Sequence, residues 1–113
     1  MAAPERFTQL SAPWQALVRL FQSINFGQVL GIVVQNGDPV FHPAPTVLLD
    51  VKLDADEGIR QEADLPDFAL RDEVRRLVAR LDGIKQGRIE RIEVRSGIPR
   101  RVVIERPLME TSL

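Results

Sequence analysis

Five arginines in the last third of the chain have the spacing of a surface that binds phosphates. Arg88, Arg91 and Arg95 fall on one expected strand, and Arg100 and Arg101 fall on the strand that returns beside it. Guanidinium groups bind phosphate oxygens through charge-assisted hydrogen bonds, whatever the base sequence. The arrangement predicts a contact surface for nucleic acid or for a protein partner.

Glutamates alternate with these arginines and weaken the case for nucleic acid. Glu90, Glu93 and Glu105 could act as paired carboxylates, but on neighbouring strands such residues more often form cross-strand ion pairs with arginine. The chain has no tyrosine, and Trp14 and Phe21 have the spacing of core residues, so we expect no exposed aromatic side chain that could stack on bases.

The remaining residue types that catalyse reactions or bind metals form no recognised motif. His42 is the single histidine and lies in a Phe-His-Pro sequence, which favours a loop residue over a ligand or an acid-base group shared between two copies. The acidic run at 54–58 resembles the start of a calcium loop, but its glycine comes one position early and no final glutamate is in place. No serine lies in a Gly-x-Ser-x-Gly motif. We predict a protein that is not an enzyme and uses no metal or cofactor.

Length and charge indicate a single domain. A chain of 113 residues can bury a core without disulfides, and it contains no cysteine to form them. The net charge of −1 hides an acidic middle, residues 50–70, and a basic part, residues 71–106, which we interpret as compensating surfaces. The N-terminus lacks an apolar signal segment, and the longest apolar stretch, residues 29–34, is too short to span a membrane. We therefore expect a soluble, cytoplasmic protein.

The clearest pattern in the chain is an internal repeat. Residues 17–41, moved forward by sixty positions, align with residues 77–101. The identical pairs are Leu17/Leu77, Val18/Val78, Ile24/Ile84, Gly27/Gly87, Ile32/Ile92, Val34/Val94, Gly37/Gly97 and Pro39/Pro99. Residues of these types shape a backbone. We predict one domain made of repeat one at about 12–53, an acidic linker at about 54–66 and repeat two at about 67–106.

The first repeat has the pattern of a helix followed by a hairpin. Apolar residues at steps of three and four predict a helix over residues 11–25. We expect Gly27 to close this helix in the left-handed conformation, and Gly87 to do the same in the second repeat. A strand rich in Val and Ile follows, with an Asn-Gly turn. Prolines then interrupt the return strand, which resumes at 46–53.

The second repeat follows the same plan with a more polar surface. Its helix is expected to begin near Pro66 or Asp67. In the strand that follows, Ile89 is out of phase with Ile92, and a bulge between them would restore the alternation of buried and exposed side chains. The last strand is expected at 99–106.

Two such units predict an α+β fold, in which one antiparallel sheet of four or five strands carries both helices on one face, related by a pseudo-twofold axis. The other face is charged in repeat two but carries Leu30 and Val33 in repeat one. An exposed apolar patch of this kind is usually covered, here either by the proline-rich segment or by a second copy. We favour the second copy and predict a homodimer with Leu30 and Val33 on the dimer face.

Two stretches of the chain resemble a known family. Residues 84–97 with 102–105, and residues 24–38, are similar to the small bacterial YezD-like proteins (the DUF2292 family), which have a short amphipathic helix, an aromatic-Gly step and a Val/Ile-rich hairpin. The chain departs from that pattern at Gln86, where the family would have an aromatic residue, and in one extra residue between the motif glycines of each repeat. Members are single-unit chains, so the resemblance implies that this chain is a fused pair, and a fused pair in turn implies that the members dimerise. It implies no activity.

These patterns together predict a small non-enzymatic interaction or accessory protein that acts as a homodimer. Its partner is expected to be a protein or a second copy of itself. A nucleic-acid-binding protein that uses the arginine-rich second hairpin is the alternative.

Overall fold

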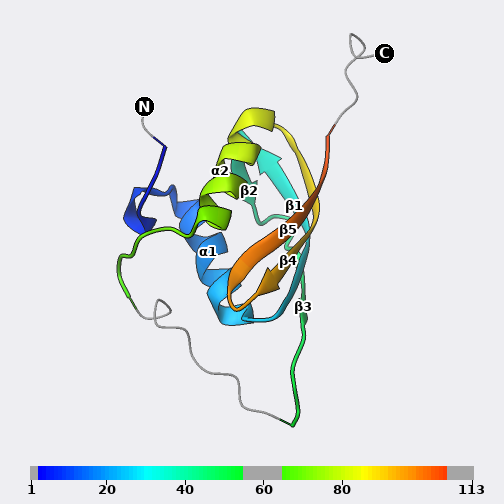
Figure 1. Cartoon of the computed structure of the whole chain (residues 1–113). Helices are drawn as coiled ribbons and strands as arrows, with labels where there is room; N and C mark the ends of the chain where they lie inside the picture. Colours follow the sequence, from blue (N-terminus) through cyan, green and yellow to red (C-terminus); the bar gives the residue numbers. More distant parts are fainter. Residues whose placement is uncertain (1–2, 55–64, 107–113) are drawn as a thin grey trace.

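Figure 1 shows the order of helices and strands along the chain. The structure is a computed structural model, and it describes residues 3–54 and 65–106. Its first described part contains a 3-10 turn, a helix and three strands: η1 (Phe7–Gln9), α1 (Ala12–Ile24), β1 (Gly27–Gln35), β2 (Asp38–Val40) and β3 (Thr46–Leu49). Its second described part contains a helix and two strands: α2 (Asp72–Ile84), β4 (Gly87–Arg95) and β5 (Ile98–Glu105). The predicted α+β class is confirmed.

The five strands of the described residues form one antiparallel sheet. β1 and β4 pair at its centre, with Gly27 opposite Val94 and Val34 opposite Gly87. β5 lies on the other side of β4, while β2 and β3 pair with opposite ends of the remaining edge of β1. The central pair of strands therefore joins the two halves of the chain.

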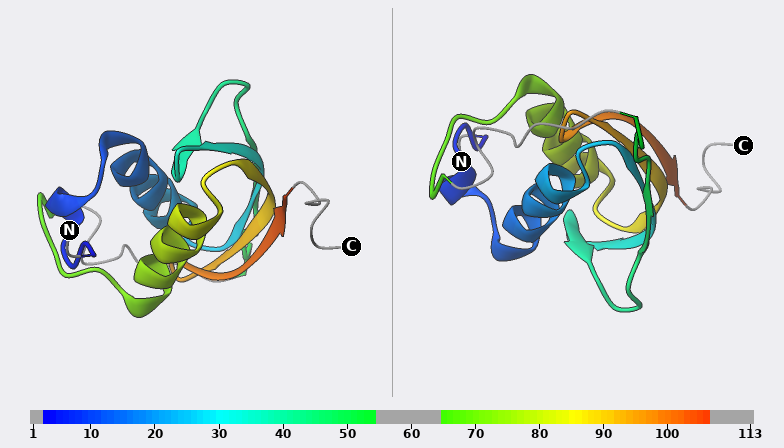
Figure 2. Two further views of the ribbon diagram at one scale, coloured as in Figure 1. Left: turned by 90° about the horizontal axis from the view of Figure 1, so that it is seen from above. Right: turned by 90° about the horizontal axis from the view of Figure 1, so that it is seen from below.

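Both helices cover the same face of the sheet, and the core lies between the two layers (Figure 2). From the helices it receives Trp14, Leu17, Val18, Phe21, Ile24, Val74, Leu77 and Leu81. From the two central strands it receives Val29, Ile32, Val34, Ile89, Ile92 and Val94, none of them more than 2% exposed. Burial of side chains of this size stabilises the fold by roughly 1.5–3 kcal/mol each. The Trp14 Nε1–H donates a hydrogen bond to the Gly37 carbonyl oxygen, 3.1 Å away, and ties α1 to the first hairpin turn.

The second hairpin contains the bulge that the sequence predicts. The register of β4 and β5 shifts between the pairs Ile89/Ile104 and Arg91/Val103, so Glu90 is an extra residue on β4. The shift lets both isoleucines of β4 face the core, where neither is exposed.

The first helix ends close to the predicted residue 25, but Gly27 and Gly87 do not close the two helices in the left-handed conformation expected for them. The capping residues are Asn25 (φ 62°, ψ −65°) and Lys85 (φ 63°, ψ −57°). The next N–H in each case donates to the carbonyl two residues earlier, at 2.7 Å, which is a γ-turn. Glycine is required at 27 for another reason: a Cβ there would lie 2.0 Å from the Leu48 carbonyl oxygen of β3.

The hairpin turn of each half is bound to the helix end of the other half. The Gly37 N–H donates to the Lys85 carbonyl oxygen at 2.9 Å, and the Gly97 N–H donates to the Asn25 carbonyl oxygen at 2.8 Å. Both glycines have positive φ angles, 78° and 71°, which the turns require. The two halves therefore meet both in the sheet and at the helix ends.

The second helix begins later than the position near Pro66 or Asp67 that the sequence predicts. The residues before α2 pair with the N-terminal segment instead: the Phe7 N–H donates to the Phe68 carbonyl oxygen at 2.9 Å, and the two rings stack with centroids 4.9 Å apart. Backbone groups held by another segment are not available for helical hydrogen bonds, so α2 starts only after this contact.

The return strand of the first hairpin is interrupted where the prolines predict it. The chain leaves the sheet over residues 41–45, and β3 pairs with β1 again from Thr46. Strand pairing ends at Leu49 and not at 53, because β1 itself begins at Gly27 and residues 50–53 have no strand of the described residues beside them. Residues 55–64 of the predicted linker lie outside the described residues, and so does the tail after residue 106.

Candidate functional site

The structure places the predicted arginines on two sides of the second hairpin. Alternation with the buried residues of β4 puts Arg88, Arg91 and Arg95 on the sheet face away from the helices, and all three are exposed. Arg101 is on that face too, because it is the cross-strand partner of Glu93.

Arg100 lies on the helix side of the hairpin. The register of β4 and β5 shifts a second time beside it, so Arg100 is an extra residue on β5. Its Nη1 lies 2.5 Å from Oε2 of Glu73 on α2. The five arginines therefore do not form one continuous surface.

Two of the outer arginines are paired with glutamates, as predicted for cross-strand pairs. Arg88 Nη1 lies 3.7 Å from Glu105 Oε2, and Arg101 Nε lies 3.7 Å from Glu93 Oε2. All four groups are solvent-accessible, so each pair contributes at most about 1 kcal/mol. Within the described residues, Arg91 and Arg95 form no ion pair.

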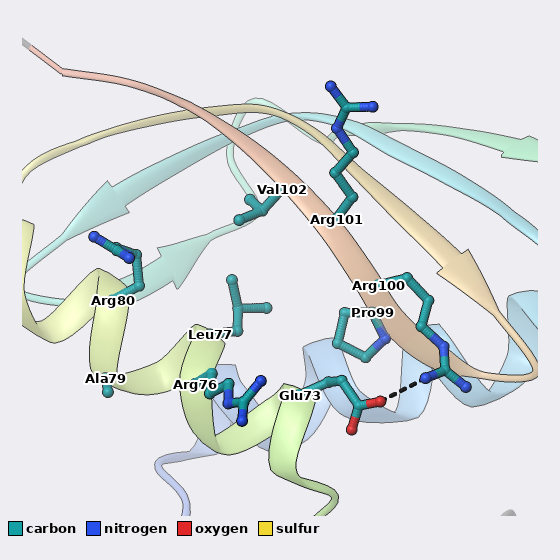
Figure 3. A pocket seen from close by; sticks show the side chains of 9 residues that line it. All are labelled: Glu73, Arg76, Leu77, Ala79, Arg80, Pro99, Arg100, Arg101 and Val102. Carbon is teal, nitrogen blue, oxygen red and sulfur yellow. Dashed lines mark hydrogen bonds and ion pairs between the residues drawn. The ribbon is translucent and has the colours of Figure 1, made fainter.

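A groove with a cavity volume of about 470 Å³ separates α2 from β5 (Figure 3). Leu77 and Pro99, both buried, and the half-buried Val102 supply its apolar surface. The charged residues around it are Glu73, Arg76, Arg80, Arg100 and Arg101. In Figure 3, Arg100 turns toward Glu73, while Arg80 projects from α2 and Arg101 from β5. The volume is within the range of sites that hold a ligand or a few side chains.

β3 is an exposed apolar edge strand, and sequence reasoning did not identify it as a surface. The large apolar side chains exposed on it and just after it are Val47 (38%), Leu48 (46%), Leu49 (62%), Val51 (59%) and Leu53 (97%). Within the described residues β3 pairs only with β1. The Asp50 N–H donates toward β1, to the Phe26 carbonyl oxygen at 2.8 Å, so strand alternation directs the N–H and C=O groups of Val47 and Leu49 to the free edge.

Leu30 and Val33, the predicted dimer face, are half-buried on the sheet face away from the helices. Leu30 lies between Thr46 of β3 and Arg91 of β4, and Val33 lies beside Arg88. Arginine side chains therefore flank this apolar pair. Its part in a dimer stays a prediction.

Asp67 ties the N-terminal segment to the residues before α2. Its Oδ2 accepts a hydrogen bond from Arg6 Nε at 2.6 Å, and its Oδ1 accepts one from the Thr8 N–H at 3.1 Å. These bonds, that of Arg6 above all, lower the pKa of Asp67 from 3.8 to about 2. This carboxylate has a structural role that the sequence did not reveal.

Other candidate residues are not brought together. His42 is exposed in the loop between β2 and β3. The acidic run at 54–58 lies outside the described residues except for Asp54. Across residues 3–54 and 65–106, no three His, Asp or Glu side chains are arranged to hold a metal ion.

Two surfaces therefore combine a defined shape with unusual chemistry: the arginine-lined groove beside β5 and the apolar free edge of β3.

Neither helix in the described part of the chain has the length and apolar character needed to cross a membrane. Comparison of the chain with protein-family models, with curated proteins and with solved structures finds no match.

Proposed function

We propose that this chain is a small interaction protein without enzymatic activity, and that it acts as a homodimer paired through the free edge of β3. The observation that carries the proposal is the exposure of consecutive apolar residues, Val47, Leu48 and Leu49, on an edge strand. An open, apolar strand edge readily pairs with another chain, because its unpaired N–H and C=O groups form a ready template. A second copy offers the same edge.

An antiparallel pairing centred on Leu48 uses β3 in its present conformation. Val47 of each copy then lies opposite Leu49 of the other, and these are the residues whose backbone groups point to the free edge. The two Leu48 side chains meet at the twofold axis. The sheets of the two copies become continuous, and the apolar side chains of β3 lose much of their contact with water.

The dimer is best tested by light scattering on the purified protein at micromolar concentration. We expect the mass of two chains for the wild type and of one chain for Leu49→Glu, because the charge would be placed inside the paired edge. Leu65→Glu is the matched control, since Leu65 is also an exposed leucine (43%) but its carbonyl oxygen accepts a hydrogen bond from Arg19 of α1, so it is not part of β3. A monomeric wild type, or a dimer that survives Leu49→Glu, would contradict the proposal. Loss of the dimer in Val33→Glu alone would assign the interface to the sheet face instead.

We also infer that the chain is a fused pair of helix-hairpin units. In support, α1 and α2, and likewise β1 and β4, begin and end sixty positions apart. The capping residues Asn25 and Lys85, also sixty positions apart, share one backbone conformation. The resemblance to the YezD-like proteins, as single units that pair, is part of the same inference.

The absence of an activity is part of the proposal and rests on the side chains that usually carry chemistry. His42 is exposed in a loop, and Asp67 is used to hold the N-terminal segment. The glutamates Glu93 and Glu105 face arginines across strands. We expect the protein to act by contact.

Nucleic-acid binding is the second candidate, because Arg91 and Arg95 are exposed and form no ion pair with another described residue. Fluorescence anisotropy with DNA and RNA oligonucleotides at low and moderate salt tests it. Under this candidate, binding weakens steeply as salt rises and is lost in Arg91→Gln with Arg95→Gln. No binding at low salt would reject it.

A further inference from the structure

The groove beside β5 has a counterpart in the first half of the chain. Pro39 of β2 and Pro99 of β5 pair with corresponding residues of β1 and β4. Because Arg100 is an extra residue on β5, the position that corresponds to Phe41 is Val102. The two halves can therefore be compared at this place, side chain by side chain.

In the first half, the corresponding positions carry large apolar side chains. Phe41 and Leu20, which projects from α1, are both partly buried against the core. In the second half the smaller Val102 corresponds to Phe41, and the exposed Arg80 stands sixty positions after Leu20. Both Val102 and Arg80 line the groove, so it lies where the second half has smaller or charged side chains in place of an aromatic ring and a leucine.

The charge around the groove is positive. Glu73, the acidic residue among those that line it, is engaged with Arg100 at 2.5 Å. Arg76 and Arg80, one turn apart on α2, form no ion pair with any described residue. The groove therefore presents guanidinium groups that carboxylates can pair with, next to an apolar floor.

β5 supplies the third element, an edge strand. It is the last strand of the sheet on its side, so its outer edge is not paired by another described strand. An extended segment can add to such an edge by backbone hydrogen bonds while its alternate side chains enter a neighbouring groove.

We propose that the groove between α2 and β5 binds an extended segment of a partner protein that carries an aromatic or large aliphatic side chain flanked by carboxylates. The apolar side chain packs on Leu77, Pro99 and Val102, as Phe41 packs in the first half. The carboxylates pair with Arg76 and Arg80, and the backbone extends the sheet beside β5. This function is separate from the homodimer, which uses the opposite edge of the sheet.

The test uses the full-length protein and a phage-displayed library of random peptides, which does not assume a sequence. We expect selected peptides to be enriched in Phe, Trp or Leu with Asp or Glu nearby. A fluorescein-labelled peptide of the most enriched sequence is then titrated by fluorescence anisotropy. An absence of enrichment, or enrichment of basic peptides, would overturn the proposal.

Variants assign the binding to the groove. Arg76→Gln with Arg80→Gln should weaken binding of this peptide about tenfold, as expected for the loss of two exposed charge pairs. Val102→Phe should weaken it at least as much without a change in charge, because it places in the groove the ring that Phe41 places in the first half. Arg91→Gln with Arg95→Gln is the matched control: it removes the same charge from the outer sheet face and should change the affinity less than about twofold.

Further controls separate the possible failures. Thermal unfolding tests whether each variant is folded. Leu49→Glu should still bind the peptide even as a monomer, so the proposals for the groove and for the dimer can be refuted independently. If the control pair weakens binding as much as Arg76→Gln with Arg80→Gln, the attraction is general and the proposal fails. If a single-stranded oligonucleotide displaces the peptide, and if its own binding is lost in Arg76→Gln with Arg80→Gln, the groove binds nucleic acid and the proposal also fails.

Discussion

Gly27 is the residue at which one added methyl group should have the largest effect. In Gly27→Ala the new Cβ would lie 2.0 Å from the Leu48 carbonyl oxygen, whereas ordinary contact begins at 3.4 Å. To restore ordinary contact, β3 must therefore move away from β1 by the difference, about 1.4 Å. The atom in the way is backbone, so a change of rotamer cannot relieve the overlap.

The cost follows from the hydrogen bonds that this movement breaks. The 2.8 Å bond from the Asp50 N–H to the Phe26 carbonyl oxygen would stretch to about 4.2 Å, beyond any hydrogen bond. The neighbouring bonds of the short β1–β3 ladder would be lost with it. β3 is exposed, so water replaces them, and two or three such bonds contribute about 2 kcal/mol to the free energy of unfolding.

Gly87→Ala is the matched control at the corresponding position. Its Cβ would lie 3.0 Å from the carbonyl oxygen of Glu105, the last residue of β5, where a shift of a few tenths of an ångström suffices. We expect a loss of less than about 1 kcal/mol. Urea unfolding at one protein concentration, followed by the fluorescence of Trp14, the single tryptophan, measures both. Equal losses in the two variants, or no loss in Gly27→Ala, would refute the reasoning.

Three other substitutions test separate parts of the fold. Asp67→Asn should lower the thermal stability much more at pH 6 than at pH 2. The pKa of Asp67 falls from 3.8 to about 2 on folding, so the ionised carboxylate stabilises the fold fully above the higher value and progressively less as the pH falls through the lower one. An equal effect at both pH values would contradict this. Trp14→Phe should cost about 1–2 kcal/mol in urea unfolding followed by circular dichroism, since it leaves the Gly37 carbonyl oxygen without its donor; an unchanged midpoint would show that water replaces the bond. Lys85→Gly should raise the free energy of unfolding by about 0.5 kcal/mol, because glycine adopts a positive φ without strain. The melting temperature should rise with it, and a lower melting temperature would mean that the turn is unstrained.

Features set by local pattern were predictable from the sequence. Apolar residues recur at helical spacing between Trp14 and Ile24, and the structure buries them in the core. The position of Ile89, out of phase with Ile92, predicted the bulge, because the alternation of buried and exposed side chains is a property of the strand itself. The Asn-Gly turn at 36–37 and the proline break at 41–45 were found for the same reason.

Features set by contacts between distant segments were not predictable. Gly27 was interpreted as a helix cap, because no local signal shows that its backbone lies against β3. The start of α2 depends on hydrogen bonds to the N-terminal segment, more than fifty residues away. Arg100 was placed beside Arg101 on one surface, but a second register shift turns it to Glu73. The groove depends on how α2 lies against β5, which composition and periodicity do not encode.

The hydrogen bonds from Gly37 to Lys85 and from Gly97 to Asn25 make each half of the chain necessary for the other. Separated, either half would have an open helix end and a central strand without a partner. Fragments 1–54 and 65–113 should therefore be unstructured alone and fold when mixed, which circular dichroism can follow; helical signal in an isolated fragment would contradict this. The chain is thus suited to fragment complementation, in which two proteins fused to its halves restore one folded domain only when they meet.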